Sequence, residues 1–269
     1  QSAILGNIII RINPKKRFGQ NFLEDQILLD ELANLMQIEN YDRFVEIGPG
    51  TGNLTQLIVD RSDFCTSIEI DRNLISLLEK KFIKKNNFKL INESILNFKL
   101  SSITKKRKSI RLAGNLPYNL SSPILEWCIQ NSEFIIDMHF MLQKEFAERC
   151  VGDENSKSYG KLSVICDYLF EVQVLKNVDK SFFKPPPKVD SSFVKFKPKK
   201  EFLDQDEFTN LKKILNYLFS AKRKKIKKTL AKIFNENEIQ KINLDFDLRP
   251  DQLNTQNFLE LSKLLNDHG

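Results

Sequence analysis

The sequence predicts an α/β fold with a mixed, mostly parallel sheet, followed by a small all-helical domain at the C-terminus. Up to about residue 200, short apolar segments alternate with segments whose apolar residues recur at helical spacing. Repeated strand-then-helix units of this kind form parallel sheets with helices on both faces. Beyond residue 200 only the helical spacing continues. We therefore expect a larger domain over residues 1–200 and a helical one over 201–269, joined by a charged stretch that contains Pro198.

The elements expected up to residue 142 follow the strand-then-helix order. A first helix is expected over residues 25–36, where apolar residues recur at helical spacing. The strands expected after it are 43–47, 64–70, 88–91, 110–113 and 134–142. The helices expected between them are 72–82 and 123–129, with another that begins after residue 52.

The remaining elements complete the sheet and form the tail. Strands over residues 168–174 and 192–197 are separated by a proline-rich connection, and we expect them to pair at one edge of a mixed sheet. The helical tail carries an apolar stripe that includes Phe208 and Leu211. A basic cluster over residues 222–228 interrupts this stripe, and we expect it to form a local contact surface.

The composition argues against several classes of protein. The four cysteines lie far apart without a C-x-x-C pair, which argues against a metal ribbon or a disulfide framework and favours a reducing, cytoplasmic compartment. Two histidines leave little material for histidine metal sites or Ser-His-Asp hydrolysis. No apolar run approaches the roughly 18 residues of a membrane span. The net charge of +7 and the pI of about 9.1 favour a polyanionic partner.

A glycine-rich segment, EIGPGTG over residues 46–52, follows the first strand expected in the parallel sheet. The missing side chains of Gly48 and Gly50 let the backbone turn sharply and approach a ligand at the carboxyl edge of the sheet. The dinucleotide fingerprint G-x-G-x-x-G would require a glycine where Asn53 stands. The pattern G-x-G-x-G after an acidic residue is instead typical of Rossmann-like class I methyltransferases, which favours S-adenosyl-L-methionine over NAD. A plain turn between a strand and a helix is the alternative interpretation.

Glu69 ends the next expected strand and is a candidate ribose ligand. An ionised carboxylate there can accept hydrogen bonds from both ribose hydroxyls. The alternative is that Glu69 caps the following helix. Asp71 is the better capping candidate because it directly precedes the first helical residue, Arg72.

The segment Asn115-Leu116-Pro117-Tyr118 follows the expected strand 110–113, at the edge where a doubly wound sheet binds its ligands. An adenine amino group is a poor nucleophile, so its methylation benefits from acceptors that hold both protons and align the nitrogen. The Asn115 side-chain oxygen and the Leu116 carbonyl can do this. Pro117 restricts Leu116 to an extended conformation, and Tyr118 offers a flat face for an extruded base. A plain Asn-x-Pro turn with a buried tyrosine is the alternative.

A proline-rich segment, FKPPPKVDS over residues 183–191, provides a second aromatic candidate. A stiff proline run could hold Phe183 over a flipped base as a second stacking wall. The alternative interpretation is a rigid connector into an edge strand.

Taken together, these segments resemble the ribosomal RNA small-subunit adenine dimethyltransferase family of the KsgA type. The resemblance covers nearly all of the chain from Lys15. The matching segments are 17–23, 48–52, 115–118, 142–145, 159–163, 183–191 and the helical tail with Arg249 and Pro250. Relatives often have Arg-Ala at the last of these positions.

The resemblance implies a cofactor site and a mechanism. The cofactor-binding residues that it implies are Asn21, Leu23, Gly48, Gly50, Glu69, Glu93 and Asn115, and Glu93 stands where the family usually has aspartate. The implied reaction is direct transfer of the sulfonium methyl group to the nitrogen of a flipped adenine, without a covalent intermediate or a metal. The implied substrates are two adjacent adenines of small-subunit ribosomal RNA, dimethylated during ribosome biogenesis.

Basic residues are the candidates for RNA binding. The main cluster consists of Lys222, Arg223, Lys224, Lys225, Lys227 and Lys228. Residues 15–17 and 105–108 are further candidate contacts. A solvated helix face is the alternative interpretation of the main cluster.

Three other functions compete with this interpretation. A DNA adenine methylase usually has an acidic or other residue before Pro-Pro-Tyr, whereas this chain has Asn115-Leu116-Pro117-Tyr118. A macrolide-resistance methylase of large-subunit RNA shares the motif, so the motif does not distinguish the two substrates. The preference for the small subunit rests on residues 183–191 and the helical tail. A non-catalytic ribosome assembly factor is the third candidate, and the intact motif argues against a purely structural role. We expect a monomer.

Overall fold

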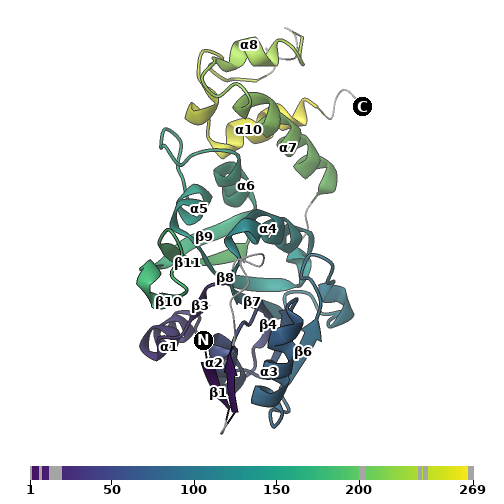
Figure 1. Ribbon diagram of the computed structural model, residues 1–269. Helices are drawn as coiled ribbons and strands as arrows, with labels where there is room; N and C mark the ends of the chain where they lie inside the picture. Colours follow the sequence, from purple (N-terminus) through teal and green to yellow (C-terminus); the bar gives the residue numbers. More distant parts are fainter. Residues whose placement is uncertain are drawn as a thin grey trace. The chain divides into compact units, whose positions relative to one another are not determined.

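The computed structural model describes residues 2–5, 8–11, 20–199, 204–235, 238 and 242–265 (Figure 1). The chain forms two compact units. The first comprises Gln1–Ala147 and Gln173–Pro198, and the second comprises Glu148–Val172 and Lys199–Gly269. The expected domain boundary near residue 200 therefore omits one segment, because residues 148–172 group with the C-terminal helices.

A seven-stranded sheet in the order β6-β5-β4-β7-β8-β11-β9 holds the first unit together. Its strands are β4 (Arg43–Ile47), β5 (Phe64–Glu69), β6 (Phe88–Asn92), β7 (Ile110–Asn115), β8 (Ile135–Gln143), β9 (Phe170–Val178) and β11 (Ser191–Pro198). The pairs from β6 to β8 are parallel, and β11 pairs antiparallel with β8. The sheet is thus mixed and mostly parallel, as the sequence predicts, and β9 and β11 are neighbours at one edge.

Helices follow the strands as the strand-then-helix pattern predicts. They are α1 (Gln26–Leu35), α2 (Asn53–Arg61), α3 (Arg72–Phe82), α4 (Ser121–Gln130) and α5 (Lys144–Cys150). Asp25 caps α1 by accepting a hydrogen bond from Leu28 N at 2.8 Å. Asp71 caps α3 in the same way, through Asn73 N at 3.1 Å, which confirms the expected cap.

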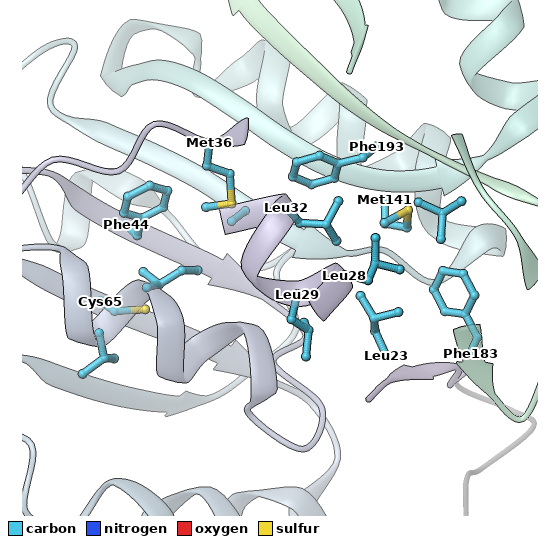
Figure 2. Packing of buried hydrophobic residues seen from close by; sticks show 14 residues of the cluster. Leu23, Leu28, Leu29, Leu32, Met36, Phe44, Cys65, Met141, Phe183 and Phe193 are labelled. Carbon is cyan, nitrogen blue, oxygen red and sulfur yellow. The ribbon is translucent and has the colours of Figure 1, made fainter. Parts of the chain in front are cut away.

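The main hydrophobic core lies between α1, α2 and the strands (Figure 2). Leu28, Leu29 and Leu32 line the buried face of α1 and pack with Phe44 of β4 and Phe193 of β11. A smaller cluster joins Phe22 to the buried face of α3. The apolar spacing used to predict these helices is therefore the spacing of their buried faces.

Three parts of the first 200 residues depart from the prediction. The strand expected over 168–174 is wrong at its start, because Tyr168 and Leu169 are the last residues of helix α6 (Lys161–Leu169) and β9 begins at Phe170. The buried face of α6 includes Val164, Cys166 and Tyr168. The short apolar run at the end of this helix resembles the start of a strand, so the helix was not recognised. The strands β1 (Ser2–Leu5) and β2 (Ile8–Arg11), which pair antiparallel, and the helices α5 and α6 were not predicted.

The described residues of the second unit form helices and turns apart from the start of β9. Besides α6 it contains α7 (Gln205–Phe219), α8 (Ile226–Leu230) and α10 (Thr255–Lys263). Phe219 of α7 stacks on Phe258 of α10 with ring centroids 5.6 Å apart. Tyr159, just before α6, donates a hydrogen bond to Leu253 O at 2.6 Å. The Tyr159 hydrogen bond and the contacts of α6 with α7 and α10 group residues 148–172 with the helical unit.

A buried ion cluster closes the amino edge of the sheet in the first unit. Arg111 of β7 donates two hydrogen bonds to Asp137 of β8, at 2.8 and 2.9 Å, and one to Asp42 before β4, at 2.5 Å. It also donates to the carbonyls of Met36 and Gln37 after α1, at 2.6 and 3.0 Å. One buried cation thus ties α1 to three strands. In the described part of the chain, no helix is both long and apolar enough to cross a membrane.

Candidate active site

A cavity opens in the first unit at the carboxyl ends of β4, β5 and β7, where a doubly wound sheet binds its ligands. The structure brings all the predicted cofactor residues to its lining. These are Asn21, Leu23, Gly48, Gly50, Glu69, Glu93 and Asn115, together with Leu116 and Pro117. They come from segments far apart in the sequence, and the parallel strands align their ends.

The glycine turn between β4 and α2 forms one wall of the cavity. Gly48, Gly50 and Gly52 have φ angles of 65°, 59° and 77°, in the left-handed region that favours glycine. A Cβ atom at Gly50 would also lie 2.9 Å from the ring of Phe22. The turn therefore needs glycine for its conformation and, at Gly50, for the close approach of a neighbouring side chain.

Glu69 ends β5 inside the cavity and is only 5% exposed. Its Oε1 accepts a hydrogen bond from Asp71 N at 2.8 Å, and its Oε2 accepts one from Gly50 N at 3.4 Å. Burial raises the pKa of this carboxyl group. Each carboxylate oxygen has two lone pairs, so both can also accept from a hydroxyl group. The geometry fits a ligand that brings two neighbouring hydroxyls.

Glu46, the acidic residue before the glycines, lies deeper in the same region and also lines the cavity. It is 1% exposed and accepts hydrogen bonds from Thr55 Oγ1 at 2.6 Å and Ser67 Oγ at 2.8 Å. Burial raises its pKa to about 7. The lining of the cavity therefore includes a buried carboxyl group that accepts hydrogen bonds from two hydroxyl groups.

Glu93 lines the cavity after β6, where the resemblance implies a contact with the cofactor's adenine. Its backbone N donates to Glu69 O at 3.1 Å, which extends the pairing of β5 with β6 by one residue. This bond fixes the backbone of Glu93 beside that of Glu69.

Asn115 is the last residue of β7, and its side chain has a defined orientation. Its Nδ2 donates to Asn21 O at 2.7 Å, which assigns the oxygen to the other side of the amide. Leu116 N donates to Met141 O at 3.2 Å, and Leu120 N donates to Pro117 O at 2.8 Å in the following turn. The Asn115-Leu116-Pro117 backbone is thus held at both ends, and both acceptors proposed for an amino group lie on a constrained segment.

Tyr118 and Phe183 are not among the residues that line the cavity. The Tyr118 hydroxyl shares a hydrogen bond with Ser191 Oγ at 2.7 Å. Phe183 is 1% exposed, pairs with Leu23 between β10 (Phe183–Lys184) and β3 (Phe22–Leu23), and belongs to the main core (Figure 2). Core side chains cover the Phe183 ring in this structure, so the ring does not face the cavity, and its role as a stacking wall stays a prediction. The rigid-connector interpretation agrees with the structure.

The basic cluster lies in the second unit, in the turn after α7 and the first turns of α8. Lys222 Nζ donates to Tyr159 O at 3.0 Å, and Lys225 forms an ion pair with Asp247 at 3.2 Å. The other members of the cluster, Arg223, Lys224, Lys227 and Lys228, are exposed. The cluster therefore is not one solvated helix face.

Residues 105–108, the other basic candidates that the structure describes, do not line the cavity. Residues 105–108 precede β7 at its amino end, on the edge of the sheet opposite the cavity. Residues 15–17 lie outside the described part of the chain. Among the described residues, no group of three or more His, Cys, Asp or Glu side chains is arranged to hold a metal ion.

The fold and the cavity define a class of protein. A Rossmann-like sheet with a left-handed glycine turn after one strand and a buried glutamate at the end of the next provides a site for an adenosine-containing ligand. The chain is an S-adenosylmethionine-dependent methyltransferase. Residues 11–267 match the sequence model described as Ribosomal RNA adenine dimethylase, and the chain belongs to that family.

Similar proteins support this assignment along the whole chain. A ribosomal RNA small subunit methyltransferase A from Pseudomonas syringae is 37% identical over 254 residues, which cover 94% of this chain and 95% of the relative. A protein of the same name from Francisella tularensis is 39% identical and covers 93% and 97%. Among solved structures, a dimethyladenosine transferase from Plasmodium falciparum superposes with a TM-score of 0.76 at 28% identity, over 91% of this chain and 97% of that one.

Sequence reasoning missed Lys81 and the role of Asn53. Lys81 lies in the last turn of α3 and its Nζ reaches the glycine turn. The one available signal was Asn53 itself, which stands where a dinucleotide-binding turn has glycine. A lysine 28 residues later in the sequence gives no comparable signal.

Proposed function

We propose that this protein dimethylates the exocyclic amino groups of two adjacent adenines in small-subunit ribosomal RNA during ribosome biogenesis, with S-adenosylmethionine as the methyl donor. The observation that carries the proposal is the constrained Asn115-Leu116-Pro117 segment beside the cavity. Small-subunit RNA is supported by relatives of that name, 35–39% identical over more than nine tenths of the chain.

Each residue has a distinct task in this proposal. When bound, S-adenosylmethionine supplies an electrophilic sulfonium methyl group. Glu69 accepts hydrogen bonds from the ribose hydroxyls, and the glycine turn lets the backbone approach the cofactor. Asn115 Oδ1 and the Leu116 carbonyl accept hydrogen bonds from the two amino N–H groups of the adenine and align the nitrogen lone pair with the methyl group. The proton leaves to water after transfer.

Positioning of the adenine nitrogen against the methyl group is sufficient to account for most of the rate enhancement in this proposal. Holding two reactants in an attack geometry contributes roughly 7–11 kcal/mol. Extruding a base costs only a few kcal/mol, so the balance favours a site that binds a flipped adenine. The proposal therefore needs rigid acceptors rather than a strong general base, and the bond from Asn115 to Asn21 supplies that rigidity.

The exposed members of the basic cluster serve RNA binding in this proposal. Arg223, Lys224, Lys227 and Lys228 are free to neutralise phosphates, whereas Lys222 and Lys225 would first exchange an internal partner. Each lost phosphate contact reduces the slope of binding against salt by about one. Substituting the four exposed residues by glutamine should weaken RNA binding and flatten its salt dependence, with cofactor affinity unchanged.

Two alternatives are less well supported. A 23S rRNA methyltransferase, ErmE, superposes with a TM-score of 0.71 at 24% identity, and this likeness concerns the fold alone. A purely structural assembly role would leave the intact acceptors at Asn115 and Leu116 without a purpose. We further propose that the protein acts as a monomer in the cytoplasm, where its four buried free thiols remain reduced.

One labelling experiment tests the proposed function. Radiolabelled S-adenosylmethionine is supplied with unmethylated small-subunit particles, large-subunit RNA or duplex DNA. We expect label in adenines of the small-subunit RNA alone, its loss with Asn115→Ala, and its retention with Asn40→Ala, an exposed asparagine before β4. Label only in DNA or in large-subunit RNA would contradict the proposal.

A further inference from the structure

We propose that Lys81 and Asn53 are positioning residues for methyl transfer, forming a latch that fixes the glycine turn and links it, through residues 21–23, to Asn115. This inference rests on the proposed function for its catalytic readout, whereas its cofactor-binding readout is independent of the RNA substrate. The latch lies within the first unit.

The ammonium group of Lys81 binds the glycine turn from the side of α3. Its Nζ donates to Thr51 O at 3.1 Å, to Gly52 O at 2.9 Å and to Asn53 Oδ1 at 3.3 Å. An ammonium group has three donors, so these contacts use all of them. The Gly50 N–H, by contrast, points to Glu69 in the cavity. Lys81 thus fixes the orientation of the peptide groups next to the one that faces the cofactor site.

Asn53 connects the turn to a second segment of the cavity wall. While its Oδ1 accepts from Lys81, its Nδ2 donates to Leu23 O at 2.9 Å. The asparagine amide provides an acceptor and a donor on two separate atoms, whereas the carboxylate of aspartate, which has the same size, has no donor. The residue that excludes a dinucleotide fingerprint therefore has a specific structural role.

The segment that Asn53 holds is the one that orients the proposed catalytic amide. Asn21 O accepts the hydrogen bond from Asn115 Nδ2 at 2.7 Å, two residues before the Leu23 carbonyl. The adjoining Gln20 side chain donates to Asp71 at the start of α3, at 3.1 Å. The segment is thus linked to α3 directly at Asp71 and indirectly through Asn53 and Lys81. Loss of the latch would loosen the hydrogen bond between Asn115 Nδ2 and Asn21 O, and so the direction of the Asn115 side-chain oxygen.

The positive charge of Lys81 interacts favourably with its surroundings. Lys81 is attracted by Glu46 below the turn, and burial lowers the pKa of its ammonium group. An uncharged residue would leave the carbonyl oxygens of Thr51 and Gly52 without their charge-assisted bonds, which are the stronger kind. Arginine keeps the charge and several donors, so it should restore part of the function.

Four variants separate positioning from general stability. Lys81→Met removes the latch, Lys81→Arg keeps its charge, and Asn53→Asp keeps the acceptor for Lys81 but loses the donor to Leu23. Lys80→Met is the matched control, because Lys80 is the neighbouring, exposed lysine of the same helix. For each variant the dissociation constant of S-adenosylhomocysteine, the single-turnover methyl-transfer rate at saturating cofactor and the urea unfolding midpoint are measured.

The expected pattern differs between the two latch residues. Lys81→Met should weaken S-adenosylhomocysteine about tenfold and slow transfer at saturating cofactor about tenfold, with Lys81→Arg recovering much of both. Asn53→Asp should bind the probe within about threefold of wild type but slow transfer about tenfold, because the link to residues 21–23 is lost. Lys80→Met should match wild type.

Two results would overturn the inference. One is wild-type probe affinity and transfer rate in both Lys81→Met and Asn53→Asp. The other is an effect on the unfolding midpoint alone, with normal affinity and rate below the transition. If wild-type protein transfers no methyl group to small-subunit RNA, the proposed function fails, but the probe titration still decides whether Lys81 holds the turn.

Discussion

The amino ends and the carboxyl ends of the parallel strands, here the amino edge and the carboxyl edge of the sheet, both bury carboxyl groups. The two edges differ in the groups that bind these carboxyls. At the amino edge, Asp42 and Asp137 form ion pairs with Arg111, whose side chain is 7% exposed. At the carboxyl edge, Glu46 and Glu69 accept hydrogen bonds from hydroxyl and backbone N–H donors of the described residues, and burial raises the pKa of both. The same sheet thus has one edge satisfied by its own charges and one edge that is not.

This difference separates structure from function. A buried ion pair with good geometry is complete without a ligand, and breaking it is costly because an unpaired charge remains. Carboxyl groups with shifted pKa values beside a cavity are instead candidates for ligand binding. We therefore expect substitutions at the amino edge to affect stability and those at the carboxyl edge to affect cofactor binding.

Arg111→Met should have the largest effect. It leaves Asp42 and Asp137 buried without their cation, and losing one partner of such a pair destabilises proteins by about 3–5 kcal/mol. Urea unfolding measures the change. If the variant loses less than about 1 kcal/mol, the amino edge is not the structural cluster that the comparison requires.

Opposite pH dependences should distinguish the two edges next. His139, beside Asp137 at the amino edge, is fully buried, and burial lowers its pKa to about 4. Between about pH 6.5 and pH 4, His139 is protonated in the unfolded chain but neutral in the folded chain. The contribution of His139 to stability is therefore complete above pH 6.5, and the free energy of unfolding falls by about 3 kcal/mol as the pH falls toward 4. Glu46 has the reverse sign, because its raised pKa makes the folded state lose stability as the pH rises from 4.5 toward about 7.

Differences between wild type and single variants isolate these contributions. The unfolding free energy of wild type minus that of His139→Gln should rise between pH 4 and 6.5, and the difference for Glu46→Gln should fall between pH 4.5 and 7. Two slopes of the same sign would mean that burial does not hold both His139 and Glu46 in their neutral forms.

Glu69→Gln should affect binding rather than folding. A hydrogen bond to a charged group contributes about 1.5–3 kcal/mol, so S-adenosylmethionine should bind about 10- to 100-fold more weakly. Isothermal titration measures this, with Glu79→Gln, an exposed glutamate of α3, as the matched control. Normal affinity together with a large loss of stability would place Glu69 with the structural edge.

Lys195→Met should have the smallest effect, although it also contacts the amino-edge cluster. Its Nζ lies 3.8 Å from Asp137 Oδ2, and its side chain is 29% exposed. Partly exposed pairs of this kind contribute at most about 1 kcal/mol. A thermal unfolding curve shifted as strongly as that of Arg111→Met would mean that Lys195, and not Arg111 alone, neutralises Asp137.

The sequence predicted the sheet and its helices because their apolar spacing coincides with their buried faces. The helix expected over residues 72–82 is α3 to the residue, and the strand expected over 43–47 is β4. Prediction failed where an amphipathic helix runs directly into a strand, as α6 does at Phe170. Periodicity alone does not place that boundary, since both elements are apolar there.

The site was predictable where local geometry demands one residue type, as at the glycine turn and Asn115. The contacts that hold it were not predictable, because Lys81, Asn53 and Leu23 meet only in the folded chain. Burial of Phe183 was equally hidden, since an aromatic residue before prolines suits a core position and a stacking wall alike.

A structure determined with S-adenosylhomocysteine bound tests the central claim, that the carboxyl edge is completed by the cofactor, most directly. We predict both ribose hydroxyls within about 3.2 Å of the Glu69 carboxylate, with the Arg111 cluster unchanged. A ligand bound elsewhere, or a ribose that makes no contact with Glu69, would contradict the account.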